Sequence, residues 1–151
     1  MNRVDFLQAK NFIFSDIQRE VDIAKSNKNA GNFLCALALL CYTEFAGGIK
    51  RNKFGIGESK RNFCSFFKDL GKEYEQFQNK HDIYKIFRCG LAHEYYVKKS
   101  CTICMLKGIE EIGIGIGSDK RYYFVVERYS EDFKKAFDNL EKNIYDKIGN
   151  E

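Results

Sequence analysis

The chain has 151 residues, enough to bury one hydrophobic core and too few for two. Hydrophobic residues make up 44% of it and charged residues 30%, a balance that excludes a disordered tail and is typical of a packed globule. The net charge of +4 is modest and does not by itself indicate a nucleic-acid partner. We therefore expect a single domain over residues 1–151.

The sequence also bears on location in the cell. The apolar run FLCALALL at 33–40 is far shorter than the roughly 20 residues that a membrane span needs. The first residues, MNRVDFLQAK, lack the apolar core of a signal peptide. We expect a cytoplasmic protein with no membrane partner, in which the six cysteines are reduced thiols.

Two helices are predicted in the first third of the chain. Apolar residues recur at helical spacing over 5–27, which predicts a long amphipathic helix. The stretch NFLCALALLCYTEFAG is apolar nearly all round and predicts the central, most buried helix. We expect Asn32 to be its N-cap and Gly47 and Gly48 to end it.

Two further helices follow a loop. The stretch ESKRNFCSFFKDLG predicts a short helix that ends at Gly71. Another helical pattern runs from about Lys72 through His93. We expect His81 to start or face this helix and not to join a site.

The chain then changes character. Three β-prone runs, SCTICMLK, IGIGIG and RYYFVVERY, are separated by short turn-forming stretches. Ser130 is the expected N-cap of a final amphipathic helix. The predicted fold is therefore mainly α, a helical bundle of four to five helices, with a small antiparallel β-hairpin or meander inserted at about 100–129, before the C-terminal helix.

Two sets of motifs are not expected to form a metal or cofactor site. Cys101 and Cys104 are three apart in a strand-like run, so their side chains point to opposite faces and do not share a metal. The glycine stretches at 55–59 and 113–117 lack both the lysine of a phosphate loop and the strand–turn–helix order of a dinucleotide-binding motif. We expect no metal and no cofactor.

A basic segment lies between Lys50 and Arg61, and its glycines predict a loop. One interpretation is a solvated surface loop, and the other is a mobile arm that binds RNA phosphates. The candidate RNA-binding cations are Lys50, Arg51, Lys53, Lys60 and Arg61.

Arg88 and His93 suit a known chemical task. A histidine can take a proton from a ribose 2′-hydroxyl, and an arginine presents a permanent forked charge to the phosphate in the transition state. On one straight α-helix, however, five steps of about 100° place the two side chains roughly 140° apart. Gly90 could bend the helix, or a second copy across a two-fold axis could bring both pairs into one cleft.

The segment FRCGLAH at 87–93 resembles the Arg-x4-6-His motif of HEPN domains, a superfamily of small helical bundles, and the order of predicted helices fits that layout. The resemblance implies a homodimer with a composite cleft and a metal-independent endoribonuclease, often a toxin or defence protein. It also implies that Arg88 stabilises the phosphate, that His93 transfers the proton, and that an antitoxin or other protein is a partner.

Other interpretations stay open. Active HEPN members commonly carry a polar residue directly after the arginine, where this chain has Cys89. The main alternative is therefore a non-catalytic module of the same type that binds RNA, a nucleotide or a protein. A third is a purely structural or interaction protein whose hairpin docks on another chain. For the pair itself a structural role also stays open, in which Arg88 pairs with a carboxylate such as Asp82 or Glu94 and His93 caps a helix end.

Overall fold

The computed structural model describes residues 1–94 and 101–146 of the chain. In chain order its elements are α1 Arg3–Lys25, α2 Asn32–Arg51, α3 Ser59–Phe67, η1 Lys68–Leu70, α4 Lys72–Lys80, η2 Tyr84–Glu94, β1 Cys101–Cys104, β2 Ile114–Ile116, β3 Tyr122–Val125, α5 Val126–Glu141 and η3 Lys142–Asp146. Here η1 is a 3₁₀ turn, and η2 and η3 are π-helical. The predicted class, a mainly helical bundle with a small sheet before the C-terminal helix, is confirmed.

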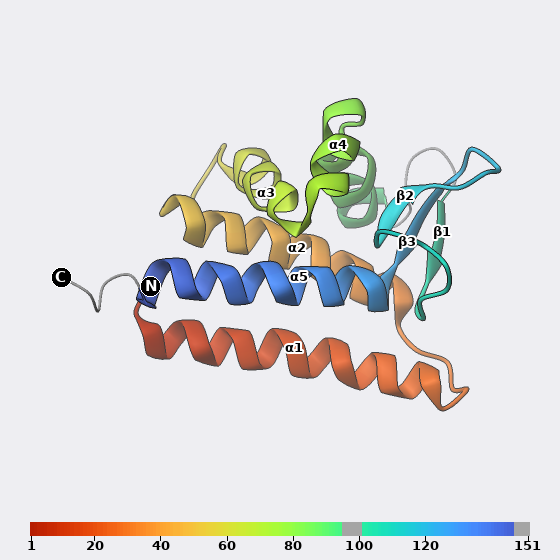
Figure 1. Cartoon of the computed structure of the whole chain (residues 1–151), viewed down its shortest axis with the longest axis horizontal. Helices are drawn as coiled ribbons and strands as arrows, with labels where there is room; N and C mark the ends of the chain where they lie inside the picture. Colours follow the sequence, from red (N-terminus) through yellow and green to blue (C-terminus); the bar gives the residue numbers. More distant parts are fainter. Residues whose placement is uncertain (95–100, 147–151) are drawn as a thin grey trace.

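The long helices form the body of the molecule. Helices α1, α2 and α5 run side by side, and α3 and α4 lie on the side of α2 that is away from α1 (Figure 1). The sheet lies at one end of this bundle, where β3 leads directly into α5. The candidate residues Arg88 and His93 belong to η2, which packs on α2.

Helix α2 starts where the sequence predicts, but its capping differs. Asn32 is its first residue, and Gly31 occupies the N-cap position without a side-chain hydrogen bond. The side-chain amide of Asn32 instead donates to the carbonyl oxygen of Ile103 at 2.9 Å. The prediction of Asn32 as N-cap is therefore wrong, because this side chain ties the start of α2 to strand β1.

Gly47 and Gly48 lie inside α2, which continues to Arg51, so the prediction that they end the helix is wrong. A Cβ atom on Gly47 would lie 1.8 Å from the carbonyl oxygen of Asn62 in α3, and one on Gly48 would lie 2.3 Å from the ring of Phe54. Glycine normally weakens a helix interior. Here the missing side chains let α3 and the following loop approach the α2 backbone closely.

The predicted helix from Lys72 through His93 is interrupted. Gly71, at φ 154°, ends the α3–η1 segment as expected, and α4 then stops at Lys80. His81 has extended backbone angles, φ −137° and ψ 137°, and its Nδ1 lies 3.1 Å from the hydroxyl of Tyr122. The break therefore lets His81 contact the sheet, and η2 starts as a separate segment.

The sheet has the strand order β1-β3-β2. Strand β2 pairs antiparallel with β3, but β1 pairs with β3 in parallel, through Cys101 opposite Tyr122 and Cys104 opposite Val125. The expectation of a wholly antiparallel hairpin or meander is corrected on this point. The reason is that the chain passes from β1 to the far edge before β3 fills the centre.

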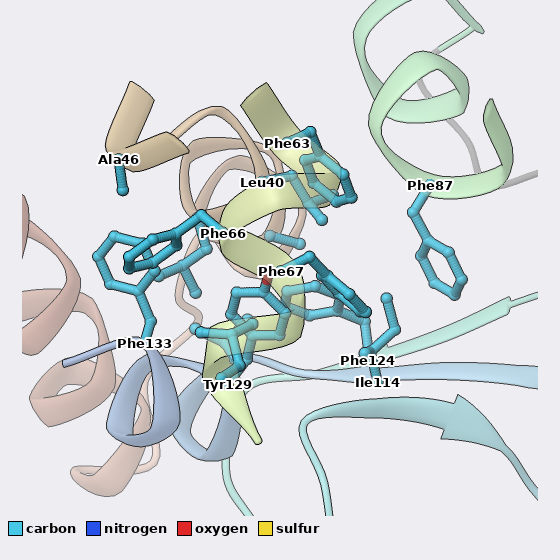
Figure 2. Close-up of a cluster of buried hydrophobic side chains, with 14 of the residues drawn as sticks. Leu40, Ala46, Phe63, Phe66, Phe67, Phe87, Ile114, Phe124, Tyr129 and Phe133 are labelled. Atoms are coloured by element: carbon cyan, nitrogen blue, oxygen red, sulfur yellow. The ribbon is translucent and has the colours of Figure 1, made fainter. Parts of the chain in front are cut away.

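The core is built mainly from aromatic side chains. Phe66 of α3 packs edge-on against Phe133 of α5, and Phe124 of β3 stacks on Tyr129 with ring centroids 4.8 Å apart (Figure 2). Tyr129 is fully buried, and its hydroxyl lies 2.8 Å from the hydroxyl of Thr43 in α2. These contacts explain why α5 begins at Val126, four residues before the predicted cap, Ser130.

A buried polar network joins α4, the segment before β2, and α5. The Tyr74 hydroxyl donates to Asp132 Oδ2 at 2.8 Å and accepts the backbone N–H of Gly113 at 2.8 Å. Arg128 Nε donates to the same carboxylate at 3.1 Å. Burial raises the pKa of Tyr74 far above its usual range, so this hydroxyl stays protonated and holds its place in the network.

The close packing at Gly47 gives a test of the fold. Gly47→Ala should lower the free energy of unfolding by about 2 kcal/mol, because the strain of overpacking exceeds the gain in helix propensity. Gly31→Ala is the matched control, since its Cβ would meet no atom closer than 3.6 Å. Urea unfolding of both variants measures the difference, and equal midpoints would contradict the packing described.

Candidate functional site

The backbone of η2 changes the relation between Arg88 and His93. Residues Tyr84–Glu94 form a π-helix, in which an N–H group bonds the carbonyl five residues earlier. Two residues five apart therefore lie roughly one turn above each other, on the same side of the helix axis. The separation of roughly 140° expected for an α-helix therefore does not apply to this segment.

The inner side of η2 fixes it to the core. The buried residues of this segment are Ile86, Phe87, Gly90 and Leu91. Phe87 is fully buried, with its ring centroid 5.4 Å from that of Tyr122 in β3. His93 is exposed on the last turn. His93 is therefore exposed to solvent, on a helix whose inner side is packed against the core.

Arg88 is held by a carboxylate from α2. Its Nε donates to Glu44 Oε2 at 3.1 Å, and both side chains are 20% exposed. Cys41 and Tyr84 lie in the same half-buried region, where burial raises the pKa of each. The positive charge of Arg88 opposes that rise at Cys41. Nε contacts Glu44, and a guanidinium carries further N–H donors of the kind that bind anions.

Glu44 is the partner of Arg88 that the sequence analysis did not name. The sequence analysis named a carboxylate such as Asp82 or Glu94 as the partner for Arg88 in a structural role. In the structure Arg88 forms an ion pair with Glu44, and Asp82 pairs with Lys60. The sequence does contain a signal for this partner, since Glu44 is the single charged residue between positions 32 and 49. A lone charge in so apolar a helix indicates a specific partner.

The basic segment is not one loop. Lys50 and Arg51 are the last residues of α2, and Lys60 and Arg61 lie in the first turn of α3, so only the residues between them form a loop. The prediction of a loop from Lys50 to Arg61 is therefore too long. Lys53 is exposed within that loop.

Four of the five cations are paired with acids. Lys50 contacts Asp69 at 2.6 Å, Arg51 contacts Glu58 at 2.7 Å, Arg61 contacts Glu58 at 3.2 Å and Lys60 contacts Asp82 at 2.6 Å. The Lys60–Asp82 pair is exposed, and exposed ion pairs exchange readily with solvent and with other anions. Lys60 lies near the site, since its ammonium is within electrostatic reach of the Cys89 thiol on η2.

The remaining candidates do not join this site. Cys101 is half-buried and Cys104 exposed on β1, which fits the expected opposite orientation. Burial raises the pKa of Cys101 to about 12. Within residues 1–94 and 101–146, no group of three or more His, Cys, Asp or Glu side chains is arranged to hold a metal ion.

No protein family, curated protein or solved structure matches this chain. The interpretation of the site therefore depends on its own geometry.

The Lys60–Asp82 pair gives a measurable electrostatic prediction. Burial raises the pKa of Asp82, but the hydrogen bonds from Lys60 and from the Lys85 backbone N–H, together with the charges of both lysines, hold the pKa below its usual range. Lys60→Met should raise that pKa, which an NMR titration of the carboxyl carbon measures. Stability from this carboxylate is present at neutral pH and is lost as pH falls through its folded-state pKa, so the variant should lose it at higher pH.

Lys53→Met is the control for that titration, because Lys53 is an exposed cation of the neighbouring loop. It should leave the Asp82 pKa unchanged. An Asp82 pKa that stays the same in Lys60→Met would show that the ion pair does not form in solution.

Proposed function

We propose that the protein is a metal-independent endoribonuclease of the HEPN type, with Arg88 and His93 as its catalytic pair. The observation that carries the proposal is the π-helical turn of η2, which sets the two residues one turn apart on the same side. The pair can therefore face one scissile phosphate from a single segment. Exposure of His93 and the anchoring of Arg88 by Glu44 support it further.

The chemistry follows from the two side chains. His93 takes the proton from a ribose 2′-hydroxyl, and the freed oxygen forms a bond to the adjacent phosphorus. The bond from phosphorus to the 5′ oxygen breaks, that leaving oxygen takes a proton from water, and the hydroxide left behind takes the proton from His93. Arg88 stabilises the charge that gathers on the phosphate oxygens. The products are a 2′,3′-cyclic phosphate and a 5′-hydroxyl.

We assign binding of the RNA backbone to nearby cations. Lys53 is exposed, and Lys60 lies beside η2 in an exposed pair that a phosphate can compete for. The predicted set also includes Lys50, Arg51 and Arg61, which would bind phosphates only on release from their carboxylate partners. A homodimer would place a second Arg88–His93 pair beside the first.

The family resemblance supplies the biological side of the proposal. It implies a toxin or defence protein that acts in the cytoplasm and is restrained by an antitoxin or another protein partner. One finding bears on location: α2 is long and apolar enough to cross a membrane by length and composition, yet half of it is buried inside the fold. Such burial is typical of the core helix of a bundle.

A non-catalytic RNA-binding module is the second candidate, and two observations favour it. Cys89 stands where a polar neighbour of the arginine is expected, and the charge of Arg88 is already balanced by Glu44. In that case the protein should bind RNA with a strong salt dependence and without turnover.

Cleavage of RNA in the presence of a chelator tests the proposal. The wild-type protein should cut, and His93→Ala and Arg88→Ala should each reduce the rate by about 100-fold or more, because each removes a group that acts in the transition state. His81→Ala is the matched control, since this other histidine contacts Tyr122 of the sheet.

Circular dichroism of all three variants separates loss of activity from loss of fold. Equal cleavage by wild type and His93→Ala would overturn the assignment. RNA binding without cleavage by the wild type would favour the non-catalytic module instead.

A further inference from the structure

The loop between α2 and α3 places an aromatic ring at the surface of the molecule. Phe54 is 58% exposed, yet its ring packs over Gly48, where a Cβ atom would come within 2.3 Å of it. Its centroid also lies 6.2 Å from that of Phe45. The absence of a side chain at Gly48 thus makes room for the ring. A ring that packs on one part and is open on the rest can stack on a planar group.

The backbone just before this ring is fixed. The N–H of Lys53 donates to the carbonyl oxygen of Gly48 at 3.1 Å, and the carbonyl oxygen of Lys53 accepts the side-chain amide of Asn62 at 2.9 Å. After the ring come Gly55 at φ 126° and Gly57 at φ 84°. A Cβ atom on either glycine would meet no described atom within 4 Å beyond the adjoining residues. The ring is therefore preorganised, and the chain beyond it leaves space for a ligand.

The charge around the ring favours an anionic ligand. Residues 50–61 contain five cations and one acid, so this segment alone accounts for the net charge of +4, and the rest of the chain is neutral overall. The acid, Glu58, is ion-paired with Arg51 and Arg61, and the hydrogen bond from Arg51 keeps the pKa of Glu58 below its usual range. A nucleotide combines the planar ring and the negative charge that this surface complements.

The ring also lies on the side of α2 that holds Arg88. Glu44 and Gly48 are four residues apart in α2, so they lie on one side of the helix, about 6 Å apart along its axis. Glu44 pairs with Arg88, and Gly48 carries the ring of Phe54. The arginine and the aromatic ring are therefore anchored one helical turn apart on one side of α2.

We propose that Phe54 stacks on an unpaired base of an RNA strand whose scissile phosphate lies at Arg88. This inference rests on the proposed function and narrows its substrate to RNA that is single-stranded beside the cut, because the bases of a duplex are already stacked on one another. Lys53, the exposed cation next to the ring, contacts the phosphate of the stacked nucleotide.

A fluorescent reporter at the ring tests the stacking. The chain contains no tryptophan, so Phe54→Trp introduces a single one. In a His93→Ala background, which keeps the RNA intact, an oligouridylate should quench its fluorescence, because a base stacks on the indole. The same strand annealed to an oligoadenylate should not.

Phe12→Trp in the same background is the matched control, since Phe12 is 62% exposed on α1, outside the loop. Quenching no greater in Phe54→Trp than in Phe12→Trp, or equal quenching by the duplex, would overturn the proposal. A blue shift of the Phe54→Trp emission with phosphatidylserine vesicles, without quenching by RNA, would also overturn it and assign the loop to a membrane surface.

The affinity for RNA tests the ring of Phe54 itself. In the His93→Ala background, Phe54→Leu keeps an apolar side chain without a ring and should raise the Kd for the oligouridylate about tenfold. Phe12→Leu should leave that Kd unchanged, and circular dichroism checks the fold of both variants. A Kd that Phe54→Leu leaves unchanged would contradict the stacking.

Cleavage by proteins that retain His93 keeps the two proposals apart. Quenching at Phe54→Trp without RNA cleavage by the wild type would support the stacking and count against the ribonuclease. Cleavage by wild type and Phe54→Leu with the same kcat and the same KM would support the ribonuclease and overturn the stacking.

Discussion

The close contact between α2 and α3 at Gly47 is the constraint on which the rest of the structure depends. It lets one helix lie at the centre of the bundle with its inner side buried against α3 and α5. With that side fixed, the flank carrying Glu44 faces η2. One helix thus forms the core and holds Arg88, and these two roles use different sides of the helix.

The second constraint is the π-helical backbone of η2. Such turns are rare in proteins, and those that occur are often found at functional sites. They interrupt the regular α-helical hydrogen bonding, and the surrounding packing must offset that cost. Here Phe87 and Leu91 supply that packing on the inner side, fully or almost fully buried. Arg88 and His93 differ in exposure: the arginine is paired with Glu44 on α2 and the histidine is exposed.

Much of the fold could be predicted from local patterns. Apolar spacing gave α1 and α2 nearly at their observed starts, and Gly71 ended its helix as expected. The failures came from tertiary contacts that no local pattern encodes. Local pattern predicts that Gly47 ends the helix, and only its proximity to Asn62 shows otherwise. Strand β1 pairs in parallel because a later strand, β3, fills the centre of the sheet. Glu44 is 44 positions from Arg88, so only the fold could join them.

The ends of the RNA products test the central claim most directly, since they report which oxygen attacks the phosphate. Wild-type protein is incubated with an end-labelled RNA and a chelator, and the fragments are analysed by mass spectrometry. Attack by the 2′ oxygen with His93 as base predicts a 2′,3′-cyclic phosphate on one fragment and a 5′-hydroxyl on the other. It also predicts no cut at a position where the 2′-hydroxyl is replaced by hydrogen. Fragments with 3′-hydroxyl and 5′-phosphate ends, or intact RNA, would contradict the account.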